Sequence, residues 1–163
     1  MELRDQLVVV VVDLGALARV EPLELGDRGQ GARQDGENPE RGGADAQGRE
    51  TTPGTTVRVE GQPATGDAAT DEAYDGFGQT WSLFDQTYQR DSLDGQGLPL
   101  LGTVHYGSGY DNAFWDGTQM VFGDGDGTVF NRFTIAVDVI GHELTHGVTG
   151  HQANLVYHDQ PGA

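Results

Sequence analysis

The stretch Thr134-Ile-Ala-Val-Asp-Val-Ile-Gly-His-Glu-Leu-Thr-His-Gly-Val-Thr149 carries the most structural information in this chain of 163 residues. Its apolar residues recur three and four positions apart, and this spacing predicts a helix with one continuous apolar face. Thr134 is a plausible cap for the start of that helix. The predicted apolar face consists of Phe133, Ala136 or Val137, Ile140, Leu144 and Val148.

Two histidines and a glutamate lie on the neighbouring face of the same predicted helix. His142 and His146 are four positions apart, so their side chains stand one turn apart and can reach one metal ion. Glu143 is close enough to hold a metal-bound water without itself being a ligand. This H-E-x-x-H pattern predicts a catalytic zinc site. The alternative is a buried helix whose histidines only make hydrogen bonds.

A catalytic zinc site needs three protein ligands and one open position. The longer pattern H-E-x-x-H-x-x-G-x-x-H would supply a third histidine, but the chain has Thr149 and Gln152 at its last two defined positions. His151 lies five residues beyond His146 and would point away from the ligand face. Residues 147–163 contain no glutamate. We therefore expect the third ligand to be missing from this chain.

The composition excludes several classes of function. The chain has 9 Lys and Arg residues against 26 Asp and Glu residues, and its formal net charge of −17 repels nucleic-acid phosphates and anionic lipids. We therefore expect neither nucleic acid nor a membrane as a partner. All the basic residues are arginine, which excludes a catalytic lysine. Because there is no cysteine, a transition metal would be held by nitrogen and oxygen atoms.

The character of the sequence changes near residue 50. Residues 21–50 contain no aromatic and few large apolar residues, too few to offset the entropy lost on folding. We therefore predict a disordered or poorly ordered acidic leader over residues 1–50. Its apolar run Leu7–Val12 is too short to span a bilayer and lacks the features of a convincing export signal. Residues 51–163 are expected to fold as one domain.

The predicted domain begins with a helix and continues with short strands. Asp67 is a suitable helix cap, and the helix is expected to end between residues 90 and 97. Extended pieces are predicted at residues 100–106, 113–115 and 119–122, with a hairpin turn at Asp116-Gly117. The first helix carries an apolar stripe formed by Ala69, Ala73, Phe77, Trp81, Phe84 and Tyr88, which we expect to face the core.

The loop Asp124-Gly-Asp-Gly127 has alternating aspartate and glycine residues, as at the start of an EF-hand calcium loop. The fifth and sixth positions are Thr128 and Val129, and an EF-hand needs glycine at the sixth. A plain turn is therefore favoured over an independent calcium loop.

Several of these motifs stand in one order along the chain: Glu60–Asp67, Val104–Tyr106, Asn112–Trp115, Met120–Gly127, Asn131–Thr134 and Gly141–Thr149. Together they resemble the thermolysin family of metallopeptidases, and most of all its protealysin-type branch, over about residues 55–163. The resemblance implies an α+β amino-terminal lobe with a short-stranded sheet, an aromatic-striped helix and a buried zinc-binding helix. A helical second lobe would follow, and the chain is expected to be truncated before it.

The resemblance also implies the activity of a zinc metalloendopeptidase, which hydrolyses internal bonds of peptide or protein substrates with a zinc-activated water. His142 and His146 would bind zinc, and Glu143 would act as the base. Tyr157 would help to stabilise the oxyanion. Asp138 matches a calcium ligand whose partner carboxylates would lie beyond residue 163, so calcium is possible in a full-length family member.

Further residues match substrate-binding positions of the family. One group would hold the extended substrate and form the cleft wall, and another would line a pocket that selects a bulky apolar residue after the scissile bond. The first group is Asn112, Ala113, Phe114 and Trp115, and the second is Phe130, Phe133 and Val139.

We expect this chain alone to bind zinc weakly and to have little or no activity, because the missing carboxy-terminal lobe would be needed to complete the site. The rival hypothesis is a non-catalytic metal-binding or interaction fragment. A third hypothesis is an acidic structural domain whose stability does not respond to zinc. The family often acts outside the cell, which favours an extracellular location.

Overall fold

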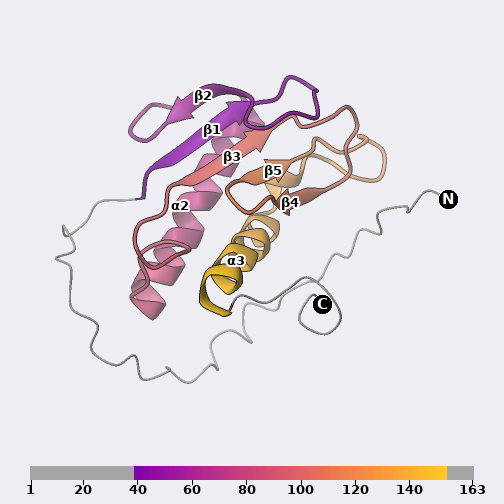
Figure 1. Ribbon diagram of the computed structural model, residues 1–163. Coiled ribbons are helices and arrows are strands. Elements are labelled where there is room, and N and C mark those ends of the chain that lie inside the picture. Colours follow the sequence, from indigo (N-terminus) through magenta and orange to yellow (C-terminus); the bar gives the residue numbers. More distant parts are fainter. Residues whose placement is uncertain (1–38, 154–163) are drawn as a thin grey trace.

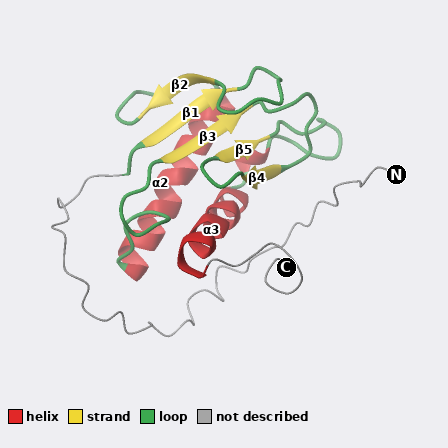
Figure 2. Ribbon diagram, in the orientation of Figure 1, coloured by secondary structure: helices red, strands yellow, loops and turns green. Residues whose placement is uncertain are grey.

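A five-stranded sheet with two long helices on one face forms the described part of the protein, residues 39–153 of a computed structural model (Figures 1 and 2). This arrangement confirms the predicted α+β class. Neither helix in these residues combines the length and apolar character needed to cross a membrane. The elements are β1 (Arg41–Asp45), β2 (Thr55–Val59), α2 (Ala68–Tyr88), β3 (Leu100–Val104), β4 (Ala113–Trp115), β5 (Met120–Phe122), the 3-10 turn η1 (Phe133–Ile135) and α3 (Val137–Ala153).

The strand order of the sheet is β2-β1-β3-β5-β4. The three central strands are parallel, whereas β2 and β4 pair antiparallel with their neighbours. β4 is therefore an edge strand, and α3 packs beside it. The predicted hairpin at Asp116-Gly117 is confirmed, because it joins β4 to β5.

β1 corrects the expected boundary at residue 50. Arg41–Asp45 was predicted to belong to a disordered leader but lies inside the sheet, between β2 and β3. Gly42 and Gly43 leave the strand almost without apolar side chains, and so composition did not reveal it. A Cβ at Gly43 would lie 2.9 Å from the Thr70 side chain, so glycine lets β1 approach α2 closely. Residues 1–38, including Leu7–Val12, lie outside the described residues.

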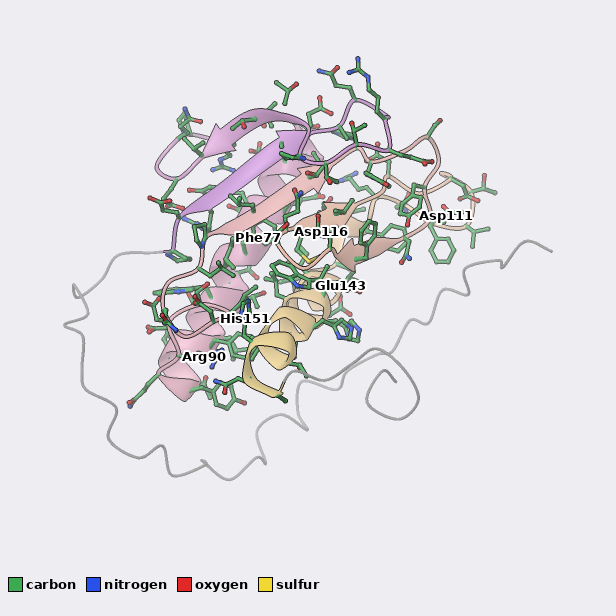
Figure 3. All side chains as sticks on the ribbon, in the orientation of Figure 1. Phe77, Arg90, Asp111, Asp116, Glu143 and His151 are labelled. Carbon is green, nitrogen blue, oxygen red and sulfur yellow. The ribbon has the colours of Figure 1, made fainter. Side chains whose placement is uncertain are left out.

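α2 follows the predicted pattern. The Asp67 carboxylate accepts a hydrogen bond from the Thr70 backbone N–H at 2.8 Å and caps the helix. Phe77 lies between α2 and the sheet, fully buried, with its ring centroid 6.2 Å from that of Phe122 (Figure 3). The stripe is less buried toward its end, where Tyr88 is exposed.

The chain after β5 bends at residues 127–129, just beyond the Asp124–Gly127 motif. Asp126 Oδ1 accepts hydrogen bonds from the backbone N–H groups of Thr128, Val129 and Phe130 at 2.8, 2.8 and 3.1 Å. The side chain of Asp126 therefore holds its own loop in place.

The start of α3 differs from the prediction. Thr134 does not cap the helix, because its hydroxyl donates a hydrogen bond to Glu72 on α2 at 2.8 Å. Ala136 is extended and separates η1 from α3, which begins at Val137. Val137 is 44% exposed, and the buried side chains of α3 are Ile140 and Leu144. In the described residues α3 thus buries one face against α2 and the sheet.

His105, directly after β3, bridges two carboxylates. Its Nδ1 lies 2.8 Å from Asp124 Oδ2, and its Nε2 lies 3.2 Å from Asp67 Oδ1. Burial disfavours the charged imidazolium, but the hydrogen bonds and charges of Asp124 and Asp67 outweigh it and raise the pKa of His105. A protonated ring can donate to both carboxylates, whereas a neutral ring can donate only to one.

This bridge predicts a loss of stability at alkaline pH. Because the folded-state pKa is raised, the stabilising contribution is complete below the unfolded value of about 6.5 and is lost as pH rises through the folded value. The melting temperature of the wild type should fall by about 2–4 °C more than that of His105→Gln between pH 6 and pH 9, a small effect because the site is partly exposed. Parallel curves for the two proteins would contradict this prediction.

Candidate metal centre

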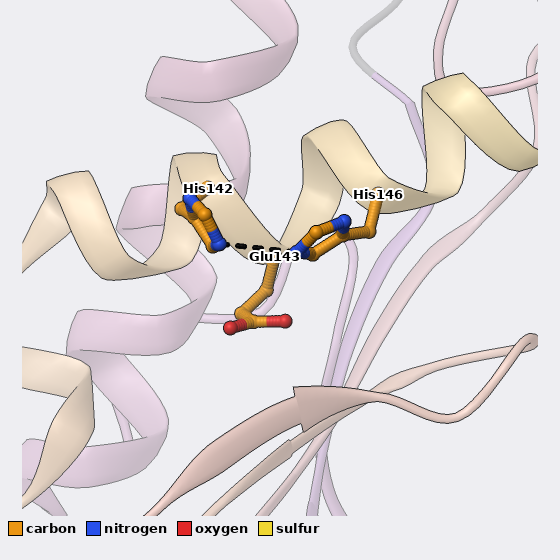
Figure 4. Close-up of side chains that lie close together, drawn as sticks. All are labelled: His142, Glu143 and His146. Carbon is orange, nitrogen blue, oxygen red and sulfur yellow. Dashed lines mark hydrogen bonds between the residues drawn. The ribbon is translucent and has the colours of Figure 1, made fainter. Parts of the chain in front are cut away.

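α3 brings its two histidines together on one side. The His142 and His146 Nε2 atoms are 3.0 Å apart, and the ring planes are nearly perpendicular, at 89° (Figure 4). The buried residues Ile140 and Leu144 anchor the helix to the core and fix this face. The predicted convergence of the two imidazoles is thus present.

The electrostatics of the two rings suit metal binding. Burial lowers the pKa of His142, and burial together with the neighbouring His142 lowers that of His146. Both rings are therefore neutral near pH 7, the form in which a histidine nitrogen can bind a metal.

The spacing of the donor atoms fits zinc. Tetrahedral zinc with Zn–N bonds of about 2.0–2.1 Å would place two ligand nitrogens about 3.3 Å apart, close to the separation found here. One ligand atom from each of His142, Glu143 and His146 lies within 4.8 Å of the others. Among residues 39–153, this is the one group of three or more such side chains that could hold a metal.

Glu143 lies on the side of α3 that faces the sheet (Figures 3 and 4). Burial raises the pKa of its carboxyl group to about 7, and a backbone hydrogen bond from Trp115 on β4 acts in the opposite direction. A carboxyl group with this pKa can both take up and release a proton near neutral pH. The sequence identified Glu143 but gave no sign of its burial.

The first group of predicted substrate-binding residues, Asn112 to Trp115, lies on and directly before β4. Trp115 packs under α3, where a Cβ at Gly147 would be 3.3 Å from the indole. Phe114 meets the rings of Tyr106 and Tyr110 edge to face, with centroid distances of 5.8 and 6.3 Å. Trp115 therefore lies beside α3, the helix that carries the two histidines, whereas Phe114 packs against Tyr106 and Tyr110.

The backbone of this region is partly occupied by its own contacts. The N–H of Ala113 donates to the side-chain oxygen of Asn112 at 2.9 Å. This N–H is therefore engaged within the chain, although Ala113 was predicted to hold substrate.

Two of the three residues predicted to line the apolar pocket are in contact. The rings of Phe130 and Phe133 are stacked, with centroids 5.7 Å apart and planes 29° apart. Val139 is partly buried against the core, one turn before His142. The stacked pair, which we call the Phe130–Phe133 surface, lies near the start of α3, with Phe133 buried in the core and Phe130 partly buried against it.

Asp138 does not contribute to the histidine cluster on α3. Asp138 is exposed, and its Oδ1 accepts a hydrogen bond from the next backbone N–H, that of Val139, at 3.1 Å. Tyr157 lies outside the described residues. The sequence also missed the pairing of Glu72 with Arg132, because no local pattern links residues so far apart in the chain.

A helix with two convergent histidine nitrogens and an adjacent, partly buried carboxyl group, packed beside an edge strand, is typical of zinc metallopeptidases. The family model described as thermolysin metallopeptidase, catalytic domain, matches residues 24–150. The chain belongs to this thermolysin metallopeptidase family.

Individual relatives agree with this assignment. The chain is 60% identical over 119 residues to "Extracellular metalloprotease" of Pectobacterium carotovorum subsp. carotovorum, covering 73% of this chain and 34% of the relative. It is 52% identical over 119 residues to "Protease PrtS" of Photorhabdus sp. (strain Az29), covering 73% and 32%. The chain therefore spans about a third of the length of these relatives.

A solved structure has the same fold. "Precursor of Protealysin, Metalloproteinase from Serratia proteamaculans" superimposes with a TM-score of 0.74 and 57% sequence identity, covering 76% of this chain and 38% of that one. This similarity confirms the expected thermolysin-like amino-terminal lobe.

Proposed function

We propose that this chain supplies two zinc ligands and the general base of a metalloendopeptidase that hydrolyses internal peptide bonds. The 3.0 Å convergence of the His142 and His146 nitrogens beside Glu143, in a chain of this family, carries the proposal. A carboxy-terminal lobe would complete the site. Without it, we expect weak zinc binding and little or no activity.

The residues of the site have separate tasks. His142 and His146 would hold zinc, which lowers the pKa of water and polarises a peptide carbonyl when bound. The Glu143 carboxylate would take a proton from the attacking water and pass it to the leaving nitrogen. Its pKa of about 7 in the chain without metal reflects the partly buried position from which it would act. Tyr157 would stabilise the negative charge that develops on the carbonyl oxygen.

The substrate would be a peptide or protein segment bound along β4. The edge position of this strand supports the proposal, because an extended chain can add beside an edge strand. The second sequence-predicted group, Phe130, Phe133 and Val139, would favour a bulky apolar residue after the scissile bond through burial of its apolar surface. Asp138 would contribute to a calcium site only with carboxylates from elsewhere.

The relative from Pectobacterium, "Extracellular metalloprotease", supports an extracellular location for this protein as well. In that setting the substrates would be extracellular peptides or proteins.

Glu143→Ala tests the proposed chemistry. The variant should bind zinc within about twofold of wild type. Any slow zinc-dependent cleavage that the wild type shows, on a fluorogenic peptide with an apolar residue after the scissile bond, should fall by about 10²-fold or more. Both should be measured on the same preparation, over an assay long enough to detect slow turnover. Absence of zinc binding by the wild type would contradict the proposal. Turnover at ordinary enzyme rates that depends on Glu143 would instead show that the chain alone is active.

A further inference from the structure

A bidentate ion pair connects α2 to the segment that leads into α3. Glu72, near the start of α2, accepts hydrogen bonds from Arg132 Nε at 2.7 Å and from Arg132 Nη2 at 2.5 Å. The same carboxylate accepts the hydroxyl of Thr134 at 2.8 Å. One carboxylate thus holds the residues on both sides of Phe133.

Residues 132–134 contact both the Phe130–Phe133 pair and the segment that begins α3. The ring of Phe133 stacks on Phe130, and its backbone N–H donates to the Gly123 carbonyl at 3.1 Å. Beyond Thr134, the carbonyl of Ala136 accepts hydrogen bonds from Val139 and Ile140 and so anchors the first turn of α3. A shift of residues 132–134 would therefore move the aromatic surface and loosen the start of the helix that carries the histidines.

The Arg132–Glu72 ion pair is expected to position nearby residues rather than to stabilise the whole fold. The side chains of Arg132 and Glu72 are 37% and 31% exposed, and ion pairs at such exposure contribute about 0–1 kcal/mol to global stability. The hydrogen bonds from Arg132 lower the pKa of Glu72, so the carboxylate is ionised at neutral pH. The bidentate geometry fixes direction as well as distance.

We propose that Glu72 is a positioning residue, which acts through Arg132 and Thr134 to place the Phe130–Phe133 surface and the first turn of the metal helix. This inference rests on the proposed function of His142 and His146 as zinc ligands. Glu72 touches neither metal nor substrate.

The chain contains a matched control pair. Glu60, just after β2, accepts hydrogen bonds from Arg41 Nε at 2.7 Å and from Arg41 Nη2 at 2.8 Å. In Glu60, as in Glu72, a hydrogen bond from arginine is the largest cause of a lowered pKa. This pair lies toward the β2 edge of the sheet, opposite the β4 edge beside α3 (Figure 1).

Glu72→Gln and Glu60→Gln should therefore have different effects on zinc binding. We expect Glu72→Gln to lower zinc affinity by about 3- to 10-fold and to alter the visible spectrum of the cobalt-loaded chain. This loss is smaller than the roughly 10- to 100-fold caused by removing a group that hydrogen-bonds a metal ligand, because Glu72 acts only through Arg132 and Thr134. Glu60→Gln should change zinc affinity by less than about twofold. The two variants should nevertheless lower the melting temperature of the metal-free chain by similar amounts. Competition with a chromogenic chelator measures the affinities.

Amide hydrogen exchange of the metal-free chain gives a second readout. In Glu72→Gln the amides of residues 139–142 should exchange faster than in wild type, whereas in Glu60→Gln they should be unchanged. Equal zinc affinities for the two variants, or equal exchange at the start of α3, would overturn the inference. If the wild type binds no zinc at all, the proposed function fails, and the exchange comparison still decides whether Glu72 positions the helix.

Discussion

His146→Ala is expected to lower the affinity of the chain for zinc by about 100-fold or more. The variant removes one of two convergent ligand nitrogens. In metal sites generally, loss of a group that only hydrogen-bonds a ligand already lowers metal affinity by about 10- to 100-fold. Zinc should raise the melting temperature of the wild type, because a ligand that binds only the folded state stabilises it by mass action. It should not raise that of His146→Ala. Chelator competition and thermal unfolding at several zinc concentrations measure both effects.

His151→Ala is the matched control for this prediction. His151 lies on the same helix but is exposed, five residues beyond His146 and away from the ligand face. The variant should bind zinc as the wild type does. Equal losses in the two variants would show that zinc binds histidines without regard to the geometry of α3, and would contradict the site.

Phe77→Ala should cause a large loss of stability. The side chain is fully buried between α2 and the sheet, where it packs against Phe122 and closely approaches Gly102. Truncating a buried phenylalanine costs about 3–5 kcal/mol, since both burial and contacts are lost and a cavity remains. Urea unfolding should show this decrease in the free energy of unfolding.

Leu83→Ala on the same helix provides the control. Leu83 is 42% exposed, and its substitution should lower the free energy of unfolding by less than about 1 kcal/mol. A loss below about 1 kcal/mol for Phe77→Ala would contradict the packing of α2 on the sheet.

The elements that could be predicted are those with a periodic signal. α2 follows from apolar residues at helical spacing after the Asp67 cap, and the β4–β5 hairpin follows from Asp116-Gly117 between two apolar runs. The metal helix was equally visible, because the four-residue spacing of His142 and His146 has a direct geometric meaning on a helix. The convergence of those two rings was therefore predictable from the sequence.

The features that could not be predicted depend on contacts between distant segments. β1 was missed because Gly42 and Gly43 carry no apolar pattern, and the sheet around them makes the strand. Thr134 looked like a cap, but Glu72 on another helix binds its hydroxyl. The burial of Glu143 likewise arises from packing of α3 beside β4.

X-ray absorption at the zinc edge of the zinc-loaded chain tests the central claim most directly. We predict that zinc is bound by two imidazole nitrogens at about 2.0–2.1 Å, together with oxygen ligands, and that one imidazole is lost in His142→Ala or His146→Ala. A spectrum without imidazole scattering, or one that neither substitution changes, would contradict the assignment of these two histidines as the metal site.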